Sequence, residues 1–360
     1  MASADVIPLT QTAVIASQSG DFEISSSTPV PTLGPTEILL RTKAVALNAV
    51  DAKLVGDFVT PGCIFGFDCC GEVVAIGKDV RRTDVKVGDR VCGSGSGMNK
   101  EKPLYGAFAE YVKLPEKSAF RISDRMSTED AAALGTPIAS ACMVLFWSLG
   151  WPLSMLDAKP DKPLSKVLVY GGSTSTGTMV LQLLRLCGVP NIATCSPRNF
   201  DLVKSYGADE VYDYKTPECA AKIRADTQNT LEYAIDCIAE DSSMRFCYEA
   251  LGRVGGQYVA LNPFNKQLAT RKVIEPDWIL ATRIDGAGSS WPAPFACEPE
   301  PKLAELSVSL FAKVQQLLNQ DKLRSHPVKV EDGGFQGILN GVEVLRKGGV
   351  SGKKLVYSLA

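Results

Sequence analysis

The segment VLVYGGSTSTGTMVLQLLRLCG (167–188) decides the fold of this chain. Four apolar residues typical of a buried strand precede a turn that holds Gly171, Gly172 and Gly177, and a run with helical spacing of apolar residues follows. Glycines in such a strand–turn–helix unit allow a tight turn and close packing of the helix on the strand, as in sites that bind a dinucleotide pyrophosphate. The segment therefore predicts a parallel, doubly wound sheet.

The centre of this loop is unusual, because hydroxyl side chains stand where glycines are common: Ser173, Thr174, Ser175 and Thr176. These hydroxyls can donate hydrogen bonds to a pyrophosphate held at the helix N-terminus. They can equally serve as helix caps in a polar turn that binds nothing. The loop alone leaves both interpretations open.

The next strand favours the cofactor interpretation. An NAD-binding site carries Asp or Glu at the end of this strand, whereas here the strand ends in TCSPRNF (194–200). Ser196, Pro197, Arg198 and Asn199 include a cation and several donors suited to a 2′-phosphate, which predicts NADPH as the cofactor. Tyr214, expected at the end of the third strand, either contacts the adenine ring, bonds the same phosphate or is structural.

The rest of the pattern indicates two domains. Strands are expected at 167–171, 191–196, 210–214, 231–238, 256–262 and 278–284, spaced for crossover helices, with a helix at 302–320 ending the unit. Short β-like runs at 37–47, 69–77, 89–93, 107–115 and 353–359 are typical of a small barrel-like domain. We predict an α/β chain with a Rossmann domain at 126–321 and a β-rich domain at 1–125 and 322–360, and 157–166 looks most like a linker.

Composition excludes several functional classes. The 360 residues carry a net charge of −2, which offers no basic face for nucleic acid. The N-terminus lacks a signal-peptide pattern, and no apolar run is long enough to span a membrane. Eleven scattered cysteines suit reduced thiols and a cytoplasmic location. His326 is the one histidine and Cys69 adjoins Cys70, so no metal site is expected.

A family resemblance rests on VLVYGGSTSTGT, ATCSPRNFDLVKSYGADEVYDY, LNPF (261–264), SSWPAPF (289–295), AVALNAVDAK (44–53), GFDCCGEVVAIGKDV (66–80) and VGDRV (87–91). With these segments the chain resembles the medium-chain dehydrogenase/reductase superfamily. More closely, it resembles the fungal trans-acting enoyl reductases, of the lovastatin-pathway type, that serve highly reducing polyketide synthases. The resemblance implies a GroES-like β-rich domain. Because Gly66-Phe67-Asp68 stands where zinc-dependent members have Gly-His-Glu, it also implies the zinc-independent branch.

The resemblance also implies site residues. The nicotinamide and its ribose are expected near Val50, Asp51, Ala52, Lys53, Leu261, Asn262, Val350 and Ser351. The acyl substrate is expected along Ala141, Cys142, Met143, Val144, Leu145, Phe146, Trp147 and Ser148, and along Ile284, Asp285, Gly286, Ala287 and Gly288. The first of these two segments is apolar enough to line a channel for an alkyl chain; a buried helix also explains it, and the two interpretations are compatible.

The expected reaction is an NADPH-dependent reduction of the α,β-double bond of a polyketide thioester, with Lys53 as a candidate donor to the developing oxyanion or as a cofactor anchor. Lys53 is equally explained as an ordinary solvent-facing lysine, and water can protonate the enolate. The expected partner is the acyl carrier domain of a polyketide synthase or synthase–peptide synthetase hybrid, for which Lys100, Lys102, Lys113 and Lys117 are a candidate docking rim. A monomer is expected. The alternatives are a zinc-independent quinone or enone reductase acting on free substrates and a non-catalytic NADPH-binding structural protein.

Overall fold

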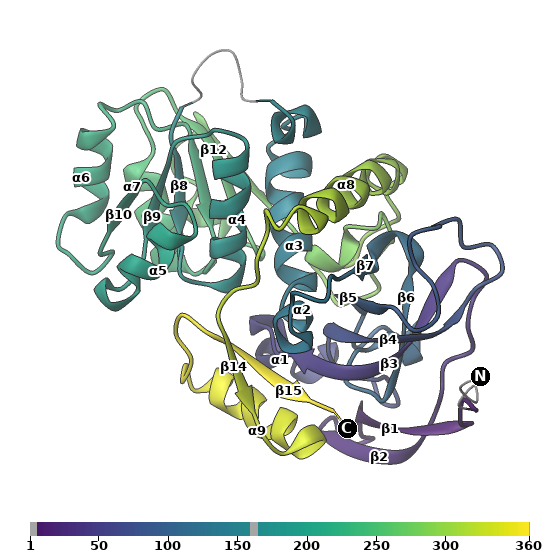
Figure 1. The fold of residues 1–360 in the computed structure, drawn as a ribbon. Helices are drawn as coiled ribbons and strands as arrows, with labels where there is room; N and C mark the ends of the chain where they lie inside the picture. Colours follow the sequence, from purple (N-terminus) through teal and green to yellow (C-terminus); the bar gives the residue numbers. More distant parts are fainter. Residues whose placement is uncertain (1–5, 159–164, 360) are drawn as a thin grey trace. The chain divides into compact units, whose positions relative to one another are not determined.

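The computed structural model describes residues 6–158 and 165–359, so most of the expected linker at 157–166 lies outside the described residues. Its contacts divide the chain into two compact units. The parallel-sheet unit comprises Pro137–Ile284, and the β-rich unit comprises Met1–Thr136 together with Asp285–Ala360. The β-rich unit is therefore built from both ends of the chain, as expected (Figure 1).

The parallel-sheet unit contains six strands in the order β10-β9-β8-β11-β12-β13. They are β8 (Val167–Tyr170), β9 (Asn191–Thr194), β10 (Glu210–Tyr212), β11 (Tyr233–Asp236), β12 (Gly256–Ala260) and β13 (Ile274–Trp278). Every pairing is parallel, and in chain order the arrangement reads 3-2-1-4-5-6, which is the order of the Rossmann fold. The predicted doubly wound sheet is confirmed.

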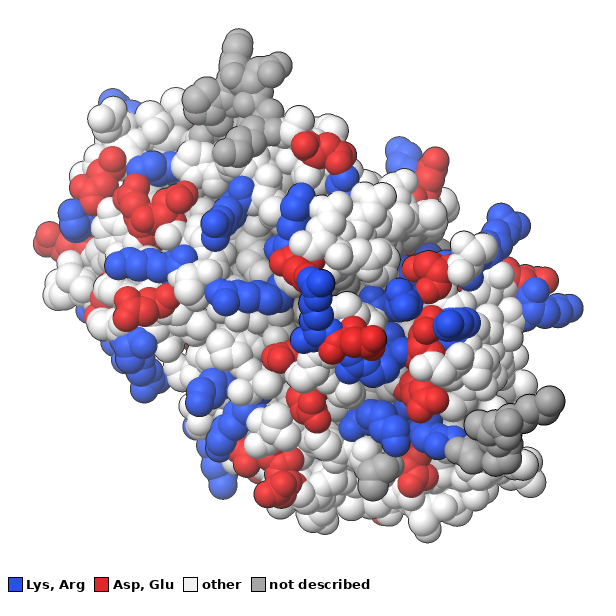
Figure 2. All heavy atoms as spheres, in the orientation of Figure 1, with Lys and Arg blue, Asp and Glu red and all other residues white. Residues whose placement is uncertain are grey.

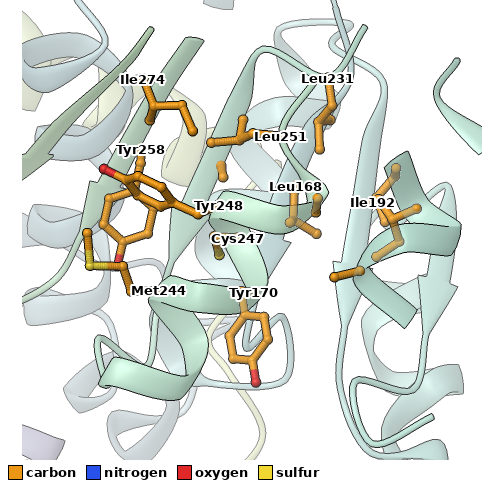
Figure 3. Close-up of a cluster of buried hydrophobic side chains, with 14 of the residues drawn as sticks. Leu168, Tyr170, Ile192, Leu231, Met244, Cys247, Tyr248, Leu251, Tyr258 and Ile274 are labelled. Carbon is orange, nitrogen blue, oxygen red and sulfur yellow. The ribbon is translucent and has the colours of Figure 1, made fainter. Parts of the chain in front are cut away.

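Helices cover both faces of this sheet: α4 (Ser175–Leu186) and α5 (Phe200–Ser205) lie on one, and α6 (Cys219–Asp226) and α7 (Asp241–Ala250) on the other (Figure 1). Figure 3 shows the core beneath α6 and α7, where Met244, Cys247 and Tyr248 of α7 meet Leu168 of β8 and Tyr258 of β12. The rings of Tyr248 and Tyr258 pack edge to face, with centroids 5.5 Å apart. This packing holds the central strands whose carboxyl ends carry the candidate site.

The prediction of the last strand was wrong. The strand lies at Ile274–Trp278, while the expected 278–284 begins at its last residue and then forms a turn of 3-10 helix, Ala281–Arg283. The expected range 278–284 is largely apolar, whereas the observed strand contains Pro276. Proline cannot donate to a sheet ladder, but it is tolerated on an edge strand, and β13 is the edge of this sheet.

The β-rich unit contains a seven-stranded mixed sheet in which β6 pairs with β3, beside the path β14-β15-β3-β4-β5-β7. Its strands are β3 (Glu37–Ala46), β4 (Asp68–Ile76), β5 (Arg90–Ser94), β6 (Tyr111–Pro115), β7 (Phe120–Arg121), β14 (Val328–Glu331) and β15 (Lys354–Ser358). A separate hairpin of β1 (Thr10–Ala16) and β2 (Phe22–Pro29) was not expected, because β2 is largely polar. The helices are α1 (Ala49–Lys53), α2 (Thr128–Ala132), α8 (Pro301–Asn319) and α9 (Gly334–Arg346).

The limits of the units differ from the predicted domain limits, since residues 126–136 and helix α8 belong to the β-rich unit. The boundary falls inside α3 (Gly135–Cys142). The α8 side chains explain the difference: Phe311 packs on Phe120 with ring centroids 5.5 Å apart, and the Gln315 amide donates to the carbonyl of Arg121 (2.8 Å). The contacts of a helix at the end of an alternating pattern cannot be read from the sequence, so its unit is set by packing.

Candidate functional site

The glycine loop after β8 has the geometry of a phosphate cradle. Gly171 has φ +78°, which favours glycine. A Cβ on Gly172 would lie 2.8 Å from the Cβ of Ala193, and a Cβ on Gly177 would lie 2.4 Å from the carbonyl oxygen of Gly171. The three glycines therefore permit the turn and the close approach of α4 to β8, as the sequence predicted. A dinucleotide fits this chain segment.

The four hydroxyl side chains of the loop differ in their hydrogen bonds and in their exposure to solvent. Thr174 is the N-cap of α4: its Oγ1 accepts from the Gly177 N–H (3.0 Å) and donates to the Gly171 carbonyl (2.9 Å). Thr176 is buried, whereas Ser173 and Ser175 are half-exposed. The capping role weighed from the sequence is thus real for Thr174, and the two serines are the hydroxyls most available to a phosphate.

The segment after β9 lies against the same loop. Ser196 precedes a short 3-10 turn, Pro197–Asn199, in which Arg198 is exposed and Asn199 is buried. The Asn199 amide donates to Ser173 Oγ (3.2 Å), so the structure brings the first two predicted cofactor segments together. Arg198 is exposed and follows β9 at the carboxyl edge of the sheet, where ligands bind in open α/β sheets.

Two further predicted cofactor segments follow β10 and β12 at the same edge of the sheet. Tyr214 is half-exposed and packs edge to face on Tyr170, with ring centroids 5.8 Å apart. This contact is structural, and the half-exposed side chain leaves its suggested roles toward adenine or phosphate as predictions. Leu261 and Asn262 follow β12 directly and are half-exposed. The carboxyl ends of four parallel strands thus carry the predicted cofactor residues of this unit.

Sequence reasoning missed Asp236, which ends β11 beside the glycine loop. Its fully buried carboxylate accepts hydrogen bonds from the backbone N–H of Ile238 (3.0 Å) and of Ala239 (2.9 Å) through Oδ1. The hydroxyls of Ser243 (2.6 Å) and Tyr258 (2.8 Å) donate to Oδ2. The turn held in this way places Ile238 against Gly171, whose added Cβ would lie 2.9 Å from Ile238 Cγ1. The sequence did contain a signal for Asp236: an acidic residue at the end of an apolar strand is expected to be buried and to need hydrogen-bond partners.

In the β-rich unit, the predicted nicotinamide segment is helix α1. Lys53 is exposed and Val50 and Ala52 are half-exposed, but the Asp51 side chain is fully buried. Arg346 of α9 donates to the carbonyls of Ala52 (3.2 Å) and Leu54 (3.4 Å). The loop after α9 carries Val350 and Ser351, which help to line a hollow of about 370 Å³. The structure therefore ties two predicted segments, 300 residues apart in sequence, to the same helix pair α1 and α9.

A buried polar cluster lies at the start of α1. Lys354 donates through Nζ to Asp68 Oδ2 (2.5 Å) and to Asn48 Oδ1 (2.7 Å), and all three residues are buried. Asp68 Oδ1 accepts from the backbone N–H (2.7 Å) and the hydroxyl (2.6 Å) of Thr136. Asp68 comes from the Gly66-Phe67-Asp68 segment, so the acid at this position holds an ammonium group of the chain itself. Among residues 6–158 and 165–359, no group of three or more His, Cys, Asp or Glu side chains is arranged to hold a metal ion.

Two neighbours of this cluster have displaced pKa values. Burial raises the pKa of the Asp51 carboxyl to about 8; a hydrogen bond from the Asn48 N–H and the charge of Lys354 oppose the rise, and the charge of Asp68 adds to it. Burial, together with the charge of Lys354, lowers the pKa of His326 to about 4. Asp51 is thus a neutral acid and His326 a neutral imidazole in the folded protein near pH 7.

These shifts predict how stability depends on pH. The folded protein keeps the Asp51 proton up to about pH 8, whereas the unfolded chain releases it near pH 4, so stability falls as pH rises between these values. His326 has the opposite effect. Between about pH 6.5 and 4 the unfolded chain protonates this imidazole and the folded protein does not, so stability falls as pH falls. From pH 6.5 to 8 the effect of Asp51 outweighs the remaining effect of His326 and should lower the unfolding free energy by at most about 1.4 kcal/mol per pH unit.

Urea titrations of the wild type and of Asp51→Asn at pH 6.5 and 8 check this prediction. We expect the difference in stability between the two proteins to change over this interval, because the amide cannot titrate. An identical pH response in both proteins would show that Asp51 is already ionised in the folded state.

The two predicted substrate segments differ in their surroundings. The first forms the end of α3 and a turn of π-helix, Met143–Ser148. Its residues are buried up to Phe146, while Trp147 and Ser148 are half-exposed and Ser148 donates to Asp277 Oδ2 (2.5 Å). The buried-helix interpretation therefore holds for most of this segment. In the second segment Asp285 accepts at its carbonyl from Lys117 Nζ (2.7 Å), and Gly286 has φ +78°.

Charges on the surface are mixed. Lys and Arg side chains alternate with Asp and Glu over the face shown in Figure 2. Of the four lysines of the expected docking rim, Lys113 pairs with Glu37 (3.2 Å) and Lys117 is bonded to Asp285 as above. Each helix in the described part of the chain is too short or too polar to cross a bilayer.

Known proteins resemble this chain over nearly its whole length. Residues 34–124 match the family described as alcohol dehydrogenase GroES-like domain, and residues 175–301 match the family described as zinc-binding dehydrogenase. The trans-enoyl reductase buaC of Petromyces alliaceus is 58% identical, with 98% of each chain covered. The trans-enoyl reductase FSL5 of Gibberella zeae is 44% identical, again with 98% of each chain covered.

Solved structures agree in fold. The CurK enoyl reductase superposes with a TM-score of 0.73 at 18% identity, covering 98% of this chain and 100% of its own. The quinone oxidoreductase of Pseudomonas syringae gives a TM-score of 0.72 at 20% identity, with 97% and 100% covered. The expected two-domain architecture, GroES-like and Rossmann, is confirmed. From the named relatives and the matched domains it follows that this chain belongs to the trans-enoyl reductases of the medium-chain dehydrogenase/reductase family.

Proposed function

We propose that this enoyl reductase uses NADPH and acts in trans, as a cytoplasmic monomer, on an α,β-unsaturated polyketide thioester. The thioester is carried by the acyl carrier domain of a highly reducing polyketide synthase or of a synthase–peptide synthetase hybrid. The names of the relatives support a separate synthase as the partner. The family implies a nicotinamide cofactor, and the choice of NADPH rests on one observation. The segment after β9, Ser196–Asn199, presents an exposed arginine and no acid where an NAD site requires a carboxylate.

The residues of the parallel-sheet unit suit the two phosphate groups of such a cofactor. The N-terminus of α4, with Ser173 and Ser175 beside it, offers backbone and hydroxyl donors to the pyrophosphate. Arg198 offers a charged fork to the 2′-phosphate, and Asn199 keeps its segment against the loop through Ser173. Burial of Asn199 makes this placement rigid before the ligand arrives, which lowers the entropy lost on binding.

The chemistry asks little of the protein beyond orientation and charge stabilisation. When bound, the nicotinamide supplies the hydride that reduces the β-carbon of the thioester. Negative charge then develops on the thioester oxygen, and a positioned donor stabilises it. We assign this hydrogen-bond donation to the Lys53 ammonium, which is exposed at the end of α1. We assign the protonation of the α-carbon to water. The acyl chain is assigned to the segments 141–148 and 284–288.

The cofactor choice predicts a selective effect of Arg198→Ala. Loss of the charge-assisted contact to the 2′-phosphate should raise the KM for NADPH about tenfold and leave the KM for NADH unchanged. Steady-state kinetics with both cofactors on a crotonyl-pantetheine thioester measure this. Arg253→Ala is the matched control, because Arg253 is also exposed but precedes β12 at the opposite, amino edge of the sheet. Equal effects on NADPH and NADH would contradict the assignment.

The partner is tested by reconstitution. Candidate synthases are assayed with and without this protein, and omission should yield a less reduced polyketide. Turnover of free quinones or enones, with no change in any synthase product, would replace this proposal by the free-substrate reductase. NADPH binding without turnover of any thioester or enone would leave only a cofactor-binding protein.

A further inference from the structure

Lys354 is a buried lysine outside the residues assigned so far. It begins β15, and its side chain is 3% exposed. Lysine is almost never fully buried unless it is paired, because removing an ammonium group from water is strongly unfavourable. Its Nζ donates to Asp68, which is completely buried at the start of β4, and to Asn48. An ion pair in this position needs an explanation beyond stability, since an apolar pair is often as stable.

Asn48 connects the ion pair to helix α1. Its side-chain carbonyl accepts from Lys354 (2.7 Å), and its side-chain amide donates to Asp68 Oδ2 (3.0 Å). Its backbone N–H donates to Asp51 Oδ2 (2.6 Å), and Asn48 is the residue that caps the helix. Both ends of one amide are therefore fixed by opposite charges, and an apolar contact would leave the same side chain free to rotate.

Helix α1 depends on such anchoring because it has only five residues. A helix this short has no stability of its own, since nucleation outweighs the few hydrogen bonds it can form. Its position is set at its two ends, by Asn48 at the start and by Arg346 at the carbonyls of Ala52 and Leu54. The first of these anchors is the one that the buried charges hold.

We propose that Lys354 and Asp68 are positioning residues, which act through Asn48 to hold α1 where its segment Val50–Lys53 contacts the cofactor. The inference rests on the proposed function, because it takes the nicotinamide of the proposed cofactor to lie near Val50–Lys53, as the family resemblance implies. Neither Lys354 nor Asp68 needs to touch the cofactor. Their charges hold an amide, the amide starts the helix, and the helix presents the contact residues.

Thr136 and Ser94 provide an internal comparison. Asp68 Oδ1 accepts two hydrogen bonds from Thr136, and the Thr136 hydroxyl lies 3.2 Å from Ser94 Oγ. This side of the cluster leads away from α1. A substitution at Ser94 therefore removes one hydrogen bond from the same network without touching the link to the helix.

Asn48→Ala tests the proposal, because it cuts the link while leaving the Lys354–Asp68 pair in place. We expect the KM for NADPH to rise about tenfold, with the KM for the thioester within about twofold of the wild type. Ser94→Ala should change neither value by more than about twofold. General destabilisation lowers the active fraction and hence the apparent kcat, so a selective rise in one KM marks positioning.

The Asn48 variants distinguish failure of the positioning role from failure of the proposed function. If Asn48→Ala does not fold, Asn48→Ser replaces it, because serine still caps a helix but cannot bridge Lys354 and Asp68. An NADPH KM of the Asn48 variant within about twofold of Ser94→Ala would overturn the positioning role while leaving NADPH use intact. Failure of the wild-type protein to bind NADPH in a fluorescence titration would overturn the proposed function and this inference with it.

Discussion

Replacement of Lys354 by Met should lower the free energy of unfolding by about 3–5 kcal/mol, as expected when one partner of a buried ion pair is removed. The methionine fills a similar volume, but Asp68 stays buried and loses its cationic partner. Its other donors, Thr136 and Asn48, are neutral and do not replace an ammonium group. Chemical denaturation of the wild type and of Lys354→Met measures the loss.

Two controls make this result specific. Lys353→Met changes the neighbouring, exposed lysine and should alter stability by less than about 0.5 kcal/mol. The double variant Lys354→Met with Asp68→Asn removes both charges and should recover most of the lost stability, since a neutral pair avoids the uncompensated carboxylate. A double variant as unstable as Lys354→Met would mean that packing at Lys354, and not charge, holds this region.

Gly177→Val should raise the Kd for NADPH roughly a hundredfold, equivalent to about 2.7 kcal/mol. The first carbon of the new side chain would lie 2.4 Å from the Gly171 carbonyl oxygen and 2.8 Å from the Gly172 Cα. These are backbone atoms, so the glycine loop and the start of α4 must move apart. The cradle assigned to the pyrophosphate moves with them, and affinity for NADH should fall equally.

A matched glycine separates this effect from general strain. Gly150, in the same unit, has φ +66° and would place a Cβ with nothing within 4 Å. Gly150→Val therefore introduces backbone strain away from the loop and should leave the Kd for NADPH unchanged. Fluorescence titration and the thermal midpoint are measured for both variants. A Kd of Gly177→Val within about threefold of the wild type would remove the loop from the cofactor site.

The sequence was most informative where local pattern and packing agree. The strand Val167–Tyr170, the glycine turn and α4 follow from residues close together in the chain, and so do the six-strand alternation and the long helix α8. The sequence was less informative where tertiary context overrides local preference. The strand Ile274–Trp278 tolerates a proline because it lies at the sheet edge, and α8 joins the β-rich unit through Phe120 and Arg121.

The same distinction applies to the candidate site. Its loops could be proposed from sequence because each motif is short, and the structure brings Ser173 to Asn199 and binds α1 to α9. The cluster around Asp68 could not be proposed. Nothing in the pattern pairs a strand-leading aspartate with a lysine 286 residues later, and Asp51 reads as an ordinary exposed helix residue. Long-range partners of buried charges are set by topology, which periodicity does not report.

The pairing of β15 with β3 also orders events during synthesis. The ribosome releases Asp68 286 residues before Lys354, and the whole of Pro137–Ile284 is made in between. Domains generally fold as units as they emerge, so the parallel-sheet unit can fold while the β-rich sheet still lacks β15 and the Lys354 counterion of Asp68. A nascent chain interrupted after α9 would contain the entire glycine loop, but Asp68 would lack its Lys354 partner. The β-rich unit can thus reach its final form only after β15 has been translated.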